Sequence, residues 1–105
     1  MYLVFGGAGS GKREFANSLQ SDMKIVDHLE KIVWDNLDDA KNVVENIVNN
    51  NQNSIIICDE IGCGLVPIDK KEREFREILG EITVDLARKA EKVFYVTLGI
   101  ARRIK

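Results

Sequence analysis

Short apolar runs separated by amphipathic stretches recur along the whole chain. Four runs have the length of strands, at residues 2–5, 24–26, 54–58 and 92–98. The run at residues 54–58 is apolar on both of its faces, which is typical of a central strand in a parallel sheet that helices cover from two sides. The pattern therefore predicts a sheet whose middle is buried.

Between these runs, apolar residues recur three or four positions apart, which is the spacing of a helix with one buried face. This spacing predicts a helix from Lys12 to about Gln20 and a shorter one over residues 28–34. Asp38 is the expected N-cap of a third helix, whose apolar positions are Ala40, Val43, Val44, Ile47 and Val48. Asp69 and Glu72 have the spacing of a capping box and predict a long helix with the stripe Phe75, Ile78, Leu79, Ile82, Leu86 and Ala90.

Strands that alternate with helices predict an α/β fold, because right-handed crossovers place helices on both faces of a parallel sheet. We expect a three-layer sandwich with a small, mostly parallel sheet of about four strands. The 105 residues fit one domain over residues 1–105. A domain this small buries a modest share of its surface, so a homo-oligomer is expected. Ligands of such sheets bind at the carboxyl ends of the strands.

A glycine-rich turn joins the first predicted strand to the first predicted helix. It satisfies the pattern G-x-x-x-x-G-K with Gly6, Gly7, Ala8, Gly9, Ser10, Gly11 and Lys12. Such a turn points successive N–H groups inward, the helix N-terminus adds positive charge, and the lysine reaches the β- and γ-phosphates. A glycine turn without a ligand is the alternative, but the strand, lysine and helix around it favour a P-loop that binds nucleotide.

The residue after Lys12 departs from the P-loop pattern. A serine or threonine there places its hydroxyl on Mg²⁺, whereas this chain has Arg13, which cannot ligate a cation. Arg13 is either the first solvated residue of the helix or a clamp on phosphate. A magnesium ion remains a candidate cofactor, with weaker support than the nucleotide itself.

Acidic residues follow two of the predicted strands. Asp59 and Glu60 end the most apolar strand, where a nucleotide site places a magnesium partner or a base. Asp27 follows the second strand and is a weaker candidate of the same kind. An ordinary carboxylate at a strand end is the alternative, and the nearby P-loop favours a functional role.

Composition excludes several other classes of function. The net charge is −2 and the basic residues are scattered, so nucleic acid is not an expected partner. The apolar runs are too short to span a bilayer, and no signal peptide precedes the first strand, so we expect a cytoplasmic protein. Cys58 and Cys63 match no zinc or redox pattern and are expected to be reduced. His28 and Trp34 are interpreted as a polar residue at a helix start and a packing residue.

Several segments resemble the adenosylcobinamide kinase/adenosylcobinamide-phosphate guanylyltransferase family. The opening Phe5–Lys12 resembles that family's first strand and P-loop, and Glu60–Pro67 resembles its E-V-G-x-G-I-V-P segment. The family's R-x-F-R-x-x-x-G helix is matched by Arg73, Phe75, Arg76 and Gly80. Gly99–Lys105 resembles its closing segment. The resemblance covers about the first twenty residues and the last fifty, and these motifs together are more specific than a P-loop alone.

The resemblance implies a RecA-like P-loop fold, subunits that form small rings, and phosphorylation of the alcohol of adenosylcobinamide by ATP or GTP. It implies that residues 6–12 hold the phosphates and that Lys12 and Glu60 act in catalysis. The family's H-R-x-x-R-P segment, which carries a guanylylated histidine, has no counterpart here. Guanylyl transfer is therefore not carried over to this chain. The family's serine after the P-loop lysine is Arg13, and its N-Q pair on the long helix is Thr83-Val84.

Two functions follow from these patterns. The first is a kinase of the adenosylcobinamide type that transfers phosphoryl from ATP or GTP to a cobinamide-type alcohol. The second is a catalytically degenerate P-loop module that binds nucleotide or regulates a partner. The sequence does not rank ATP against GTP, and it leaves open which family strand residues 24–27 match.

Overall fold

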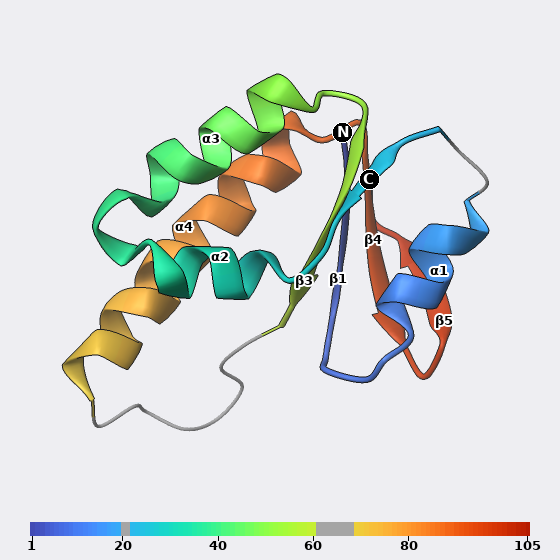
Figure 1. Cartoon of the computed structure of the whole chain (residues 1–105). Coiled ribbons are helices and arrows are strands. Elements are labelled where there is room, and N and C mark those ends of the chain that lie inside the picture. The colour runs from blue at the N-terminus through green and yellow to red at the C-terminus, as the bar shows by residue number, and fades with distance from the viewer. Residues whose placement is uncertain (20–21, 61–68) are drawn as a thin grey trace.

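Figure 1 shows the computed structural model, which describes residues 1–19, 22–60 and 69–105. The described elements are β1 (Tyr2–Gly6), α1 (Lys12–Ser18), β2 (Lys24–Val26), α2 (Leu29–Asp35), the 3₁₀ helix η1 (Leu37–Asp39), α3 (Ala40–Asn50), β3 (Ser54–Asp59), α4 (Lys70–Lys89), β4 (Lys92–Thr97) and β5 (Ile100–Arg103). The structure confirms the alternation of strands and helices that the hydrophobic pattern predicts.

The sheet has β1 at its centre. Its strand order is β2-β3-β1-β4-β5, and the first four strands run parallel. Gly6, the last residue of β1, is level with Asp59 of β3 on one side and Val96 of β4 on the other. The glycine turn therefore starts at the middle of the carboxyl edge, between the ends of two neighbouring strands.

The sheet includes one strand more than the sequence pattern indicates. Residues 100–103 form β5, which pairs antiparallel with β4, whereas no strand was predicted after residue 98. The predicted strand over residues 92–98 is one residue too long, because Leu98 has a φ of 52° and lies in the turn to β5 with Gly99. A short amphipathic edge strand pairs on one side only and gives little sequence signal.

Helices cover the two faces unequally (Figure 1). One face carries α1, and its core contains Val4, Ala16, Ile55, Ile57 and Val96. The other face carries α2, α3 and α4 over a larger core that includes Leu3, Leu29, Val33, Val44, Ile56, Leu79, Ile82 and Leu86. The fold is thus a three-layer α/β sandwich of the P-loop type. None of the helices in the described ranges has the length and apolarity needed to cross a membrane.

Of the two N-cap residues predicted from the sequence, one is confirmed and the other is wrong. Asp69 is the N-cap of α4, and its carboxylate accepts a hydrogen bond of 2.8 Å from the Lys71 N–H. The predicted N-cap Asp38 is wrong, because Asp38 lies within η1 and α3 begins at Ala40 after Asp39. The 3₁₀ turn displaces the helix start by one residue. No side chain in the described structure caps that end of α3.

Glycine is required at the end of β1 by the closeness of the neighbouring strand. A Cβ on Gly6 would lie 2.3 Å from the Val96 carbonyl oxygen and 2.9 Å from Ser10 Oγ. Gly11 has a φ of 95°, and a Cβ there would lie 3.1 Å from Gly99 Cα. The turn is therefore fixed against the β4 end of the sheet by backbone rather than by flexible side chains.

We expect Gly6→Ala to lower the free energy of unfolding by about 2 kcal/mol or more, because the backbone of β4 has to shift. Gly80→Ala is the matched control. Gly80 lies in the interior of α4, and a Cβ there meets no atom within 4 Å. Alanine at that position should raise the free energy of unfolding by about 0.5–1 kcal/mol. Urea unfolding followed by circular dichroism measures both, and equal effects of the two substitutions would contradict the close approach at Gly6.

Candidate functional site

The glycine turn has a defined backbone conformation. Gly9 and Gly11 have positive φ values of 72° and 95°, and the Ser10 N–H donates to the Gly7 carbonyl at 3.2 Å. The Phe15 N–H donates to the Gly11 carbonyl at 3.0 Å, so α1 begins directly at the end of the turn. The Gly99 N–H donates to the Ser10 carbonyl at 2.7 Å, which fastens the turn to the β4–β5 connection. The turn and the start of α1 consequently lie at the carboxyl edge of the sheet.

The turn also contains a buried hydroxyl. Ser10 Oγ has no hydrogen-bond partner among the described residues, although a buried polar atom normally has one. Phosphate oxygens accept hydrogen bonds from hydroxyls and from backbone N–H groups alike. The hydroxyl is therefore compatible with a loop whose polar groups bind an anion.

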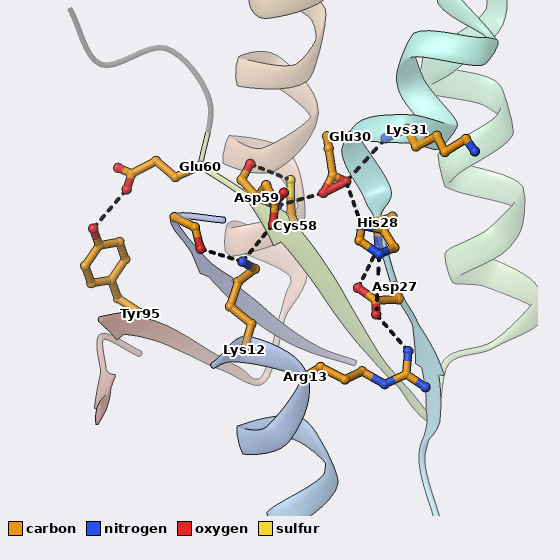
Figure 2. A network of polar contacts seen from close by, with 11 residues as sticks. Lys12, Arg13, Asp27, His28, Glu30, Lys31, Cys58, Asp59, Glu60 and Tyr95 are labelled. Atoms are coloured by element: carbon orange, nitrogen blue, oxygen red, sulfur yellow. Dashed lines mark hydrogen bonds and ion pairs between the residues drawn. The ribbon is translucent and has the colours of Figure 1, made fainter. Parts of the chain in front are cut away.

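Lys12 is the most buried charged side chain of the site, with 7% of its surface exposed. Its ammonium donates to the Gly7 carbonyl at 2.7 Å and forms an ion pair of 2.7 Å with Asp59 Oδ1 (Figure 2). The structure thus brings together the predicted P-loop lysine and the acid that follows β3. It places both at the carboxyl edge of the sheet, where ligands of this fold class bind.

Arg13 and Asp27 form a second ion pair at the same edge. Arg13 Nη1 donates to Asp27 Oδ2 at 2.7 Å, and Figure 2 shows the arginine reaching from α1 toward the end of β2. Burial alone would raise the pKa of Asp27. Hydrogen bonds from Arg13 and from the His28 N–H, together with the nearby positive charges, outweigh burial and hold that pKa below its usual value. Asp27 is therefore a stable anion paired with a cation from this chain.

Glu60 is directed away from Lys12. Its carboxylate accepts a hydrogen bond of 2.9 Å from the Tyr95 hydroxyl, on the β4 side of the turn (Figure 2). Its N–H donates to the Gly6 carbonyl at 2.7 Å, which holds the start of the turn. The predicted motif over residues 60–67 otherwise lies outside the described residues, as does Cys63.

Glu30 is a site residue that the sequence analysis missed. It lies in the first turn of α2, and its Oε1 accepts a hydrogen bond of 2.9 Å from the Asp59 N–H. Its Oε2 lies 3.8 Å from His28 Nδ1. Its position in the sequence gave one signal. Glu30 lies in the first turn of the helix that follows β2, and that helix also begins at the carboxyl edge, where ligands bind. The contact with β3 depends on β2 and β3 being neighbours, which a single sequence does not establish.

Beside the turn, a pocket of about 340 Å³ lies between the ends of β1 and β3 and the helix α4. Asp59, Glu60, Arg76 and Thr83 are its polar lining residues, and its apolar lining includes Leu3, Phe5, Leu79 and Val84. The pocket is mostly apolar, with carboxylates at one end. Such a pocket suits a bulky acceptor with an apolar body and a polar reacting group.

The residues at the edge do not fit a magnesium ion of the usual P-loop kind. Mg²⁺ requires octahedral oxygen ligands, and position 13 supplies a guanidinium in place of a hydroxyl. Asp27 and Asp59 are each paired with a cation of this chain. One group among the described residues has metal-ligand spacing: His28, Glu30 and Asp59 offer ligand atoms within 4.8 Å of one another. Its imidazole suits a transition metal better than Mg²⁺.

An α/β sheet whose central strand leads through G-x-x-x-x-G-K into a helix defines the P-loop class of nucleotide-binding folds. The sequence model of one family, described as cobinamide kinase / cobinamide phosphate guanyltransferase (CobU), matches residues 22–104. The chain belongs to this family. The match includes residues 22–55, most of which lie outside the segments whose motifs resemble this family. It does not include the turn at residues 6–12.

Two curated relatives are similar to part of the chain. The bifunctional adenosylcobalamin biosynthesis proteins CobU of Salmonella typhimurium and of Escherichia coli are each 37% identical to it over 51 residues. That stretch is 49% of this chain and 28% of each relative. The similarity thus spans less than a third of the length of these relatives.

We expect Asp59→Asn to destabilise the fold, because it leaves the buried Lys12 ammonium without its anionic partner. The expected loss in free energy of unfolding is about 1–3 kcal/mol, since hydrogen bonds to charged groups are stronger than neutral ones. Asp85→Asn is the control, because it removes an acid from an exposed pair with Lys89 on α4 and should change stability little. Chemical unfolding of both variants provides the comparison. Equal stability of the two would contradict the importance of the Lys12–Asp59 contact.

Cys58, which is buried, is expected to resist alkylation. Burial, followed by the charges of Glu30 and Asp59, raises the pKa of its thiol from 9.0 to about 12, and only the thiolate is nucleophilic. In a Cys63→Ser background, iodoacetamide at pH 9 should modify the unfolded chain in urea and leave the folded chain intact. Between pH 9 and 12 the unfolded chain loses a proton that the folded chain keeps, so this thiol lowers stability as the pH rises. Rapid alkylation of the folded chain would disprove the raised pKa.

Proposed function

We propose that this chain binds the phosphates of ATP or GTP at residues 6–12 and transfers a phosphoryl group to the alcohol of a cobinamide-type acceptor. The observation that carries the proposal is the buried Lys12 ammonium, held at the end of β1 by the Gly7 carbonyl and Asp59. Membership of the cobinamide kinase family supports the acceptor class.

The phosphate cradle follows from the backbone of the turn. Gly9 and Gly11 adopt positive φ values, and the N–H groups that open α1 have no carbonyl of their own helix to bind. These donors and the helix dipole favour a polyanion. Lys12 adds a compact positive charge that can leave the Gly7 carbonyl for a phosphate oxygen, which is the stronger acceptor.

The acceptor would bind in the pocket beside Asp59 and Glu60. A transferring site needs a group that accepts the proton of the attacking hydroxyl, and both carboxylates line the pocket. Glu60 is exposed and bound only by Tyr95 among the described contacts of its side chain, so it is the better candidate for the base. Asp59 would hold Lys12 and the end of β3 in place.

The second candidate function is nucleotide binding without turnover. The Arg13–Asp27 ion pair favours it, because a guanidinium replaces the hydroxyl that P-loop enzymes place on magnesium. The absence of an H-R-x-x-R-P segment argues against guanylyl transfer in this chain. His28, its single histidine, lies between Asp27 and Glu30, 3.9 and 3.8 Å away.

We expect Lys12→Met to weaken binding of ATP and GTP at least about tenfold, because a charge-assisted contact to phosphate is lost. Lys41→Met is the matched control, since Lys41 is an exposed lysine on α3 that pairs with Glu81. Equilibrium dialysis with labelled nucleotide measures both variants. A Lys12→Met protein that binds nucleotide like the unchanged chain would refute the proposed phosphate site.

Incubation with γ-labelled ATP or GTP and adenosylcobinamide separates the two candidate functions. Labelled acceptor supports the kinase, and Glu60→Gln should then lower the rate while nucleotide affinity is retained. Nucleotide that is bound but not consumed in the presence of the acceptor supports the binding module.

A further inference from the structure

The residue after the P-loop lysine is held by an acid of its own chain. Arg13 lies in the first turn of α1, directly after Lys12, and its Nη1 is 2.7 Å from Asp27 Oδ2 beyond the end of β2. The Asp27 side chain is 22% exposed and the Arg13 side chain 54%. The pair therefore has one partly buried anion and one cation that remains open to solvent.

Two ion pairs engage both aspartates that follow strands at this edge. Asp59 is paired with Lys12, and Asp27 is paired with Arg13. A divalent cation next to Asp27 would be repelled by the guanidinium, and position 13 offers no oxygen to ligate it. The positive charge that magnesium brings to the phosphates in other P-loops must here come from the chain or be missing.

Arg13 can supply that charge. A guanidinium has five N–H donors in a planar fork that matches two phosphate oxygens, and it is ionised at every working pH. Among the described residues, Arg13 donates a hydrogen bond to Asp27, and it does so through one nitrogen, Nη1. The remaining donors are available at the edge where the turn and α1 begin. Asp27 limits the rotamers of the arginine, which lowers the entropy cost of binding an anion.

We propose that Arg13, positioned by Asp27, replaces magnesium in this P-loop, so that the turn binds a metal-free nucleoside triphosphate. This inference rests on the proposed nucleotide site and adds that the site binds its nucleotide without Mg²⁺. The preferred ligand is the free triphosphate anion. The magnesium complex has a smaller negative charge, so the Arg13 guanidinium attracts it less, and it brings a second cation close to the guanidinium.

The test compares affinity for ATP and for GTP in excess EDTA and in excess MgCl₂, by equilibrium dialysis with labelled nucleotide. We expect the unchanged chain to bind in EDTA at least as tightly as in MgCl₂. Arg13→Ser should bind about tenfold more weakly in EDTA, because a charged donor to phosphate is lost, and should recover affinity when MgCl₂ is added. Asp27→Asn should weaken binding in EDTA less than Arg13→Ser, since it releases the arginine without removing it.

Arg88→Ser is the control for net charge, because Arg88 is an exposed arginine on α4. It should bind like the unchanged chain in both buffers. Arg13→Lys keeps the charge without the fork, so it should bind in EDTA with an affinity between those of Arg13→Ser and the unchanged chain. Circular dichroism establishes that each variant is folded before its affinity is compared.

Three outcomes are distinguishable. Metal-independent binding that is lost in Arg13→Ser supports the inference. Binding by the unchanged chain that requires MgCl₂, or unaltered binding by Arg13→Ser in EDTA, overturns it and leaves the nucleotide site intact. No binding in either buffer refutes the nucleotide site, and the inference is then wrong as well.

Discussion

The contact of the Lys12 ammonium with Asp59 and the Gly7 carbonyl is the interaction on which the site depends. An ammonium that is 7% exposed is stable only when its donors have acceptors, and these two supply them. The contact also joins three elements: the turn after β1, the start of α1 and the end of β3. Glu30 extends the connection to α2, since it binds the Asp59 N–H. The geometry of the carboxyl edge is thus set by one buried charge and its partners.

Around this contact, the site is an arrangement of matched charges. Lys12 faces Asp59 and Arg13 faces Asp27, so both aspartates that follow strands at this edge have a cation from the P-loop or the first turn of α1. Such a site is ready for a polyanion without being strongly positive as a whole, which agrees with a chain whose net charge is −2. An incoming phosphate would exchange one anionic partner of these cations for another.

Family membership and local chemistry describe different parts of the chain. The family match covers residues 22–104 and therefore the elements from β2 to β5, without β1 and α1. The turn at residues 6–12 is supported by its own backbone geometry. Arg13 lies in sequence between the turn and the residues that match the family. It keeps the position of a P-loop residue while changing its chemistry from an oxygen ligand to a cation.

The sequence alone determined the parts that depend on local patterns. Apolar periodicity identified β1, β3, α4 and most of the other elements, because burial on one face or on two faces leaves a direct pattern in neighbouring residues. The turn Gly6–Lys12 was identified for the same reason, since its conformation needs glycines at fixed spacing. The N-cap Asp69 was recognisable, whereas the start of α3 was misplaced at Asp38 because a 3₁₀ turn competes with the helix there.

Only the tertiary structure decided which side chains meet. The order β2-β3-β1-β4-β5 makes Gly6 level with Asp59 and brings Glu30 onto the Asp59 N–H, and strand order is a long-range property that no local pattern encodes. The pairing of Arg13 with Asp27, 14 residues away, and the turning of Glu60 toward Tyr95 also depend on it. Local sequence selects the elements because it acts over one or two turns of chain. The contacts between strand ends arise only when the whole sheet has assembled.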